Sequence, residues 1–181
     1  MYKRQISDVI DVPRGVLLPS FAPDGETILF TRRGRYVFEL WTVPVSGGEP
    51  TMLLRDAAFG AFSPDGSSIA FHRTGTAAWP DIAYRIDPSV WIANADGSGR
   101  RRLAGDTYLM VTTVDMEWTV PRWAPDGTRI AYQDSLDANP GPIIVAWVGD
   151  PGRRTQTLGV GTWPTWVDDT TLIVQDPGAP A

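Results

Sequence analysis

The chain holds few residues that could perform acid–base or nucleophilic chemistry. Among its 181 residues there is one histidine, His72, and no cysteine. The sequence has no Gly-x-Ser-x-Gly segment, which would present the nucleophile of a serine hydrolase. His72 directly follows Phe71 in a strand-like run, so we interpret it as a hydrogen-bonded structural residue. The sequence therefore predicts no catalytic residues and no enzymatic activity.

Metal and cofactor sites are not predicted either. The run from Asn94 to Gly99 shares part of the pattern of a calcium loop, but it lacks a third carboxylate and a distal glutamate. We interpret it as a turn. No group of histidine and acidic residues has the spacing of metal ligands. The glycine-rich turns stand between strand-like runs and not before helices, so no phosphate loop is implied.

With catalysis, metal binding and cofactor binding not predicted, binding of a partner is the function that remains. Segment 74–87 is the candidate contact site for this partner. Long connecting segments with aromatic side chains are where binding concentrates. This one carries Trp79 and Tyr84 beside Asp81 and Arg85, which suits an anchor with a polar surround. A second interpretation stays open, in which the aromatic side chains pack on the chain itself. The expected partner is a protein or peptide of unknown identity.

The charge of the chain excludes some partners. The net charge is −5 and the isoelectric point is about 4.8, which argues against a nucleic-acid or anionic-membrane surface. The arginine runs 32–35 and 100–102 are read as solvated turns, with an acidic partner patch as the alternative. No run of 18 apolar residues occurs, so no membrane span is predicted.

No signal peptide is predicted in the residues given, because no apolar core follows the basic Lys3 and Arg4. Two interpretations of residues 1–5 stay open. They are either an artefact of cloning or sequence assembly, whose residues match a translated transposon end, or an ordinary solvated N-terminus.

The elements of the chain follow from a repeated hairpin unit. Its clearest copy runs from Phe62 through Pro64, Asp65 and Gly66 to Phe71. Near-copies occupy 21–30 and 123–132, and an eroded copy without Pro or Gly occupies 166–174. Four copies of one hairpin indicate a repeat architecture.

The turn inside this unit has specific chemistry. Proline fixes φ at the second position of a type I turn, aspartate can bond the local backbone, and glycine supplies the positive φ that closes a hairpin with a bulge. The aromatic residue before the turn should therefore lie beside the isoleucine seven residues later, as in Phe62 and Ile69. The fourth copy has a spacing of six, from Trp166 to Leu172, so we expect its turn to differ in shape.

Each full unit is predicted to contain four β-strands, and no helix is expected because no segment has a 3.6-residue period with caps. Tryptophans 41, 91 and 147 fall in the third strands. We interpret the repeated aromatic residues as packing between units, with a ligand platform as the alternative. Pro19, Pro121 and Pro164 each stand two residues before the strand aromatic, and Gly60 takes that place in unit two. Proline is confined to sheet edges, so the first strands are expected to be edges, which favours a propeller over a closed barrel.

The repeat Pro-x-aromatic-Ser/Ala-Pro-Asp-Gly-x-x-Ile, followed later by a tryptophan strand and Gly-Ser-Gly, resembles the WD-like propeller repeat of the TolB family. The resemblance covers Val16 to Val174. It implies an all-β fold, a partial β-propeller with about three and a half four-stranded antiparallel blades. The expected division begins with an N-terminal tail at 1–15. On one interpretation this tail contains an outer strand left over from a preceding unit, and residues 1–5 are an artefact. The blades follow, with blade 1 at 16–56, blade 2 at 57–106 with insertion 74–87, blade 3 at 107–159 and half of blade 4 at 160–181.

The resemblance also implies a function. It predicts a non-enzymatic TolB-like scaffold for protein–protein interaction, periplasmic or otherwise extracytoplasmic, with no cofactor. The alternative is a regulatory propeller segment of a prolyl-oligopeptidase-type serine peptidase, whose catalytic domain is missing from this chain.

Overall fold

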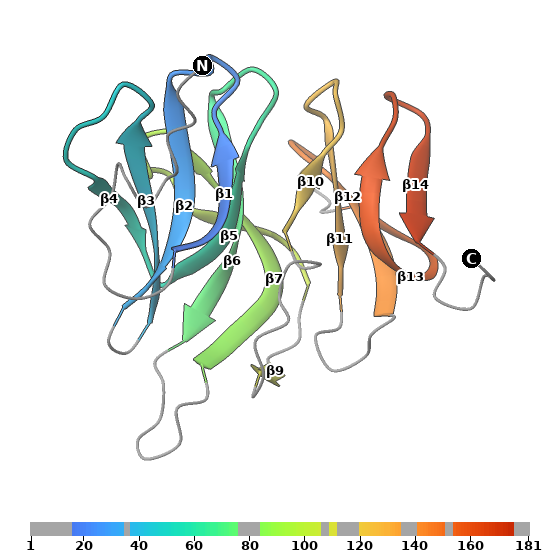
Figure 1. Cartoon of the computed structure of the whole chain (residues 1–181). Coiled ribbons are helices and arrows are strands. Elements are labelled where there is room, and N and C mark those ends of the chain that lie inside the picture. The colour runs from blue at the N-terminus through green and yellow to red at the C-terminus, as the bar shows by residue number, and fades with distance from the viewer. Residues whose placement is uncertain are drawn as a thin grey trace.

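A computed structural model describes residues 16–34, 37–75, 84–105, 109–111, 120–134, 141–150 and 154–175. All regular elements in these ranges are β-strands, paired antiparallel. The strands form sheets that stand side by side in an arc, each twisted and facing the next (Figure 1). The predicted fold class is confirmed: the chain is all-β and forms part of a propeller.

The first two sheets, here called blade 1 and blade 2, follow the chain in simple order. Blade 1 consists of β1 (Val16–Phe21), β2 (Thr27–Arg33), β3 (Phe38–Pro44) and β4 (Thr51–Arg55). Blade 2 consists of β5 (Ala57–Phe62), β6 (Ser68–Gly75), β7 (Tyr84–Asn94) and β8 (Arg101–Ala104), and β9 (Leu109–Val111) also pairs with β7. The sequence did not predict β9.

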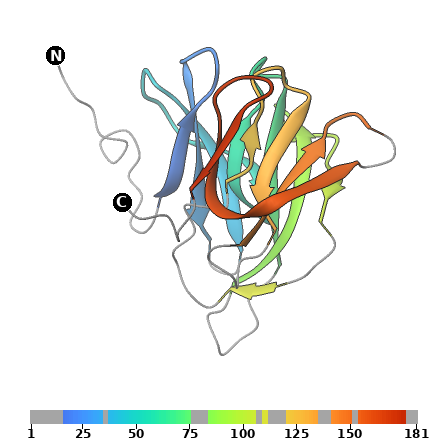
Figure 2. The ribbon, with the colours of Figure 1, turned by 90° about the vertical axis from the view of Figure 1, so that its right-hand side faces the viewer.

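The third sheet has five strands, because one long strand serves two units. Its strands are β10 (Arg122–Trp123), β11 (Arg129–Gln133), β12 (Gly141–Trp147), β13 (Thr155–Trp166) and β14 (Leu172–Gln175). The first part of β13, to Gly161, pairs with β12, and the part from Thr162 pairs with β14. We call β10–β12 with the first part of β13 blade 3, and the rest of β13 with β14 the half-blade (Figure 2).

The predicted edge strands are found in this arrangement. Strands β1, β5 and β10 are edges of their sheets, and the part of β13 from Thr162 pairs with β14 alone, although it continues the outer strand of blade 3. Pro164 also avoids the ladder, because it falls where the β13–β14 register shifts between Thr162 and Thr165. The predicted boundaries between units remain predictions. Strand β9 lies in the range 107–159, which the sequence assigns to blade 3, but it pairs with β7 of blade 2.

The repeated turn forms as its chemistry dictates. In blade 2 the Gly66 amide donates to the Ser63 carbonyl at 2.9 Å, Gly66 has φ 73°, and the Ser67 amide donates to Asp65 at 3.0 Å. The same turn closes the first and third copies. The predicted cross-strand neighbours are confirmed: each turn aromatic lies opposite its apolar partner, as Phe21–Ile28, Phe62–Ile69, Trp123–Ile130 and Trp166–Leu172.

A second repeated feature lies three residues before the turn aromatic. Leu18, Phe59 and Trp163 have φ values of 49°, 57° and 55°, which is unusual for residues other than glycine. The strand register shifts at each of these positions, so each is a β-bulge. Leu18 and Phe59 meet in one apolar cluster with Val120, the residue at the equivalent position just before β10.

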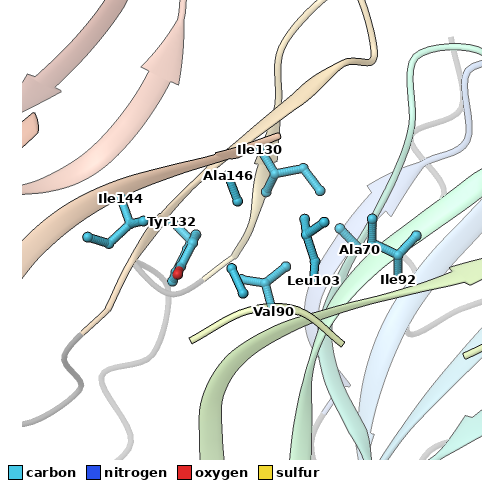
Figure 3. Packing of buried hydrophobic residues seen from close by; sticks show 9 residues of the cluster. Ala70, Val90, Ile92, Leu103, Ile130, Tyr132, Ile144 and Ala146 are labelled. Carbon is cyan, nitrogen blue, oxygen red and sulfur yellow. The ribbon is translucent and has the colours of Figure 1, made fainter. Parts of the chain in front are cut away.

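Alternating side chains join the blades face to face. In β6, Ile69 and Phe71 pack with Leu29 and Leu40 of blade 1, whereas Ala70 packs on the side of blade 3. Figure 3 shows the second contact, where Val90 and Leu103 lie against side chains of β11 and β12. Each large side chain buried there contributes roughly 1.5–3 kcal/mol to stability. Tryptophans 41, 91 and 147 lie in β3, β7 and β12, the third strands, as predicted.

The close approach of the outer strands yields a stability prediction. A Cβ added at Gly97, whose φ is +81°, would lie 2.7 Å from the Leu53 carbonyl oxygen of blade 1. Gly149 has φ +82° in the equivalent turn, with nothing within 4 Å of its Cβ position. Gly149→Ala should therefore cost about 1–2 kcal/mol of unfolding free energy through backbone strain alone. Gly97→Ala should cost about 1–3 kcal/mol more, because the blades must separate. Equal costs in urea denaturation would contradict this blade contact.

The half-blade generates a second prediction. Exposed apolar side chains at this end of the arc include Val160, in the blade 3 part of β13, and Ile173 in the half-blade, which are 64% and 58% exposed. Exposed apolar surface beside an unpaired strand edge favours association between molecules. We expect the 181-residue chain to self-associate in sedimentation velocity, and the double variant Val160→Lys/Ile173→Lys to reduce that association. A monomeric chain with cooperative unfolding at high temperature would refute this expectation.

Candidate functional site

A groove of about 570 Å³ crosses the ends of the first strands, on the side of the repeated turns. We call it the turn-side groove. Its walls come from all four units and include three of the turn aromatics and several prolines near the repeated turns. The lining residues are Pro23, Ala61, Phe62, Ser63, Pro64, Pro121, Arg122, Trp123, Pro125, Thr165 and Trp166.

The aromatic rings of this groove are held by a repeated hydrogen bond between blades. The indole Nε1 of Trp123 donates to the carbonyl oxygen of Ala61 at 3.0 Å. The indole Nε1 of Trp166 donates to the carbonyl oxygen of Arg122, also at 3.0 Å. Both acceptors directly precede the turn aromatic of the preceding blade. Each ring is thus fixed in orientation, and its N–H is used within the protein.

Arg129 fixes the last of these rings. Its guanidinium lies 5.2 Å from the centroid of the Trp166 ring and 2.9 Å from a carboxylate oxygen of Asp126. It also donates to the Asp169 carbonyl in the turn of the half-blade. This cation therefore has partners on both sides of the contact between blade 3 and the half-blade.

Among the described residues that line the turn-side groove, Arg122 is the one with a charged side chain. Within the described part of the chain, no carboxylate or carbonyl group is bonded to its guanidinium. Arg122 is an exposed residue of β10, but partial desolvation of its guanidinium lowers its pKa from the usual value, and the group stays charged at neutral pH. The groove thus presents apolar rings with a single cationic donor.

Aspartates of the turns flank the groove with negative charge. Hydrogen bonds from the Ser63 hydroxyl and the Ser67 amide hold the pKa of Asp65 below its usual range. The Thr128 amide chiefly does the same for the pKa of Asp126, and the Thr170 amide for the pKa of Asp168. These carboxylates act as turn-closing acceptors and remain ionised at neutral pH.

The segment predicted as a contact site lies only partly within the described residues. Trp79 and Asp81 lie outside them. Tyr84 and Arg85 begin β7, where their backbones pair with Val111 and Met110 of β9. The two ends of segment 74–87 are therefore strand and not loop, since β6 continues to Gly75 and β7 starts at Tyr84.

The other residues considered from the sequence take structural positions. His72 is fully buried in β6, opposite Val90 and Ala58. Asp96 accepts the Ser98 amide at 2.9 Å and closes the turn that shared the calcium-loop pattern. Across the described ranges, no group of three or more potential ligand residues could hold a metal ion.

The third-strand tryptophans also face arginines. Arg32 lies 4.8 Å from the Trp41 ring, Arg73 lies 5.1 Å from Trp91, and Arg154 lies 4.2 Å from Trp147. Arg100 donates to the Arg55 carbonyl of blade 1 at 3.1 Å. Members of both arginine runs thus stabilise ring faces and strand ends. In the described ranges there is also no helix long and apolar enough to cross a membrane.

Four-stranded sheets that pack face to face in an arc, with first strands toward a shared centre, define the β-propeller class. No family model matches the sequence, and no curated protein matches it either. Solved structures do match. TolB from Acinetobacter baumannii superposes with a TM-score of 0.62 at 16% identity, over 91% of this chain and 39% of that one. The fold is therefore that of a TolB-like β-propeller, and the chain spans well under half the length of this TolB.

Two peptidases also contain this arrangement. A puromycin-hydrolysing peptidase from Mycobacterium tuberculosis matches with a TM-score of 0.54 at 21% identity, over 84% of this chain and 26% of that one. The tricorn protease matches with a TM-score of 0.53 at 13% identity, over 84% of this chain and 18% of that one. At these identities the matches establish the fold and not the activity.

The turn aspartates predict how stability depends on pH. Their folded-state pKa values are lowered, so their contribution is present above the unfolded pKa and is lost as the pH falls through the folded one. We expect the unfolding free energy to decrease between about pH 5 and about pH 2. The variant Asp65→Asn/Asp126→Asn/Asp168→Asn keeps an acceptor oxygen in each turn, so its loss over that window should be smaller. An unchanged slope in urea titrations would contradict the assignment.

Proposed function

We propose that this propeller segment is a non-enzymatic scaffold for protein–protein interaction, and that segment 74–87 supplies the contact. The faces of the blades are occupied by packing on one another, as in the cluster that joins blade 2 to blade 3. Strand ends and their connections are the surfaces left for a partner. Loops on a rigid scaffold are where binding residues concentrate.

The observation that carries this proposal is the length of the β6–β7 hairpin. Strand β7 has 11 residues, whereas the equivalent β3 and β12 have 7 each. Its additional ladder pairs include Thr74–Ile86 and Gly75–Arg85, beyond a register shift after His72. The hairpin extends past the neighbouring blades at the end opposite the repeated turns (Figure 1). Such a projection can carry Trp79 and Tyr84 as anchors, with Asp81 and Arg85 as the polar surround.

An extracytoplasmic location, with the periplasm as the specific case, is part of the same proposal. It is supported by the TolB-like repeat and the matching fold. Fractionation of cells that produce the full-length protein tests it, and recovery in the cytoplasmic fraction would contradict it.

A second candidate function has its own support. The matches to the tricorn protease and the puromycin-hydrolysing peptidase favour a propeller that regulates access to a separate catalytic domain. The discriminating observation is the reading frame around this segment. A hydrolase domain with a Gly-x-Ser-x-Gly nucleophile downstream favours the peptidase, whereas a signal peptide and an N-terminal domain favour the scaffold.

The contact assignment predicts the effect of removing the anchors. The double variant Trp79→Ala/Tyr84→Ala of the full-length protein should lose at least about tenfold in affinity for its partner, because aromatic anchors dominate interface energies. Affinity is measured by surface plasmon resonance with the purified partner, and the melting temperature is measured in parallel. Unchanged affinity with an unchanged melting temperature would exclude the segment.

Phe21→Ala is the matched control for this experiment. Phe21 is 65% exposed and lies beside the repeated turn of blade 1, at the other end of the sheets. Its removal should leave partner affinity unchanged. A loss of melting temperature without loss of affinity in the double variant would show that its aromatic side chains pack on the chain itself.

A further inference from the structure

The turn-side groove has a chemistry that the scaffold function does not use. It lies at the opposite end of the blades from the β6–β7 projection, because β6 begins at the repeated turn and ends at Gly75. Phe62, Trp123 and Trp166 line it in order, one from each of three successive units. None of the groove's lining residues belongs to segment 74–87.

The rings in the groove can offer only apolar surface to a ligand. The Nε1 groups of Trp123 and Trp166 already donate to backbone carbonyls, so neither indole has a donor left. The hydroxyls of Ser63 and Thr165 are likewise engaged, since Ser63 donates to a carboxylate oxygen of Asp65 at 2.6 Å and Thr165 donates to the Trp163 carbonyl oxygen at 3.2 Å. Among the described side chains of the groove, Arg122 is therefore the one with donors left for a polar ligand group.

The positive charge of Arg122 is complementary to an anionic group on a ligand. Arg122 lines the groove, and within the described ranges its guanidinium has no charged or hydrogen-bonding partner. A guanidinium that is partly desolvated by apolar walls pairs strongly with a carboxylate, which it can bind through two parallel N–H···O bonds. Asp65 and Asp126 are charged in the flanking turns, so a ligand with several carboxylates would be repelled. The complementary ligand has one carboxylate between apolar groups.

The dimensions of the groove favour an extended peptide. Its lining begins at Pro23 in the turn of blade 1 and ends at Trp166 in the half-blade. Packed sheets stand about 10 Å apart, so a path across the four units is up to about 30 Å long. An extended chain advances about 3.3 Å per residue, and about nine residues span that path.

We propose that the turn-side groove binds an extended peptide segment of a partner protein, in which a single carboxylate side chain flanked by aromatic or proline residues pairs with Arg122. The apolar residues of the peptide pack on the rings of Phe62, Trp123 and Trp166. The carboxylate occupies the position in front of the guanidinium, where it replaces water.

The test uses a peptide probe of about nine residues, acetyl-Gly-Ser-Pro-Phe-Glu-Phe-Pro-Ser-Gly-amide, labelled with fluorescein through its first serine. The control probe has glutamine in place of glutamate. Binding to the purified 181-residue chain is measured by fluorescence anisotropy. The glutamate probe should bind about tenfold more tightly than the glutamine probe, since a charge-assisted pair replaces a neutral contact.

Variants of the protein localise the effect. Arg122→Gln should abolish the difference between the two probes, and Arg122→Lys should retain part of it because the charge remains. Arg101→Gln removes the same charge from an exposed position in β8 and should leave the difference intact. Circular dichroism melting curves check that the variants remain folded.

Three results would overturn the proposal: no binding of either probe up to about 1 mM, equal binding of the two probes to the unmodified chain, or a preserved difference in Arg122→Gln. The outcome is separable from that for segment 74–87, because the variants alter opposite ends of the blades. Raising the salt concentration should weaken the glutamate probe more than the glutamine probe.

Discussion

Both faces of each sheet carry apolar side chains, and both must be covered. In β6 the alternation of Ile69, Ala70 and Phe71 sends neighbouring residues into opposite interfaces, one with blade 1 and one with blade 3. A single blade could not exclude water from both faces, so the blades depend on one another for stability. The same requirement explains why Val160, in the outer strand of blade 3, and Ile173, in the two-stranded half-blade, remain exposed at the end of the arc.

Polar contacts between neighbouring blades add to the apolar packing. The indole-to-carbonyl bonds of Trp123 and Trp166 fix the register of one first strand against the next, and Arg129 adds a cation at the last contact. Phe62 occupies the same position in blade 2, but its ring has no N–H to donate. The contact between blades 1 and 2 therefore uses other groups. One of them is the buried Thr31 hydroxyl of blade 1, which accepts a hydrogen bond from the Phe59 amide of blade 2 at 2.9 Å. Rings held in this way form a pre-organised wall, and the turn-side groove is a consequence of how the blades are joined.

The two proposed contact regions differ in origin. The β6–β7 projection arises from residues added to one unit and not to the others, so it is specific to blade 2. The groove arises from positions present in every unit, with Arg122 as the local addition that gives it charge. A propeller segment of this shape has two separate surfaces at opposite ends of its sheets, while the blade faces between them are covered by packing.

The sequence by itself determined the repeat, the turn and the strand neighbours. Pro64, Asp65 and Gly66 each have a local conformational preference, and these preferences add up to one hairpin without help from the rest of the chain. The cross-strand pair Phe62–Ile69 follows from that turn alone. Only the tertiary structure decided the joining of two units in β13, the pairing of β9 with β7, and the groove around Arg122. These features depend on contacts between residues far apart in the chain, and no local preference specifies which distant strand or ring will be the neighbour.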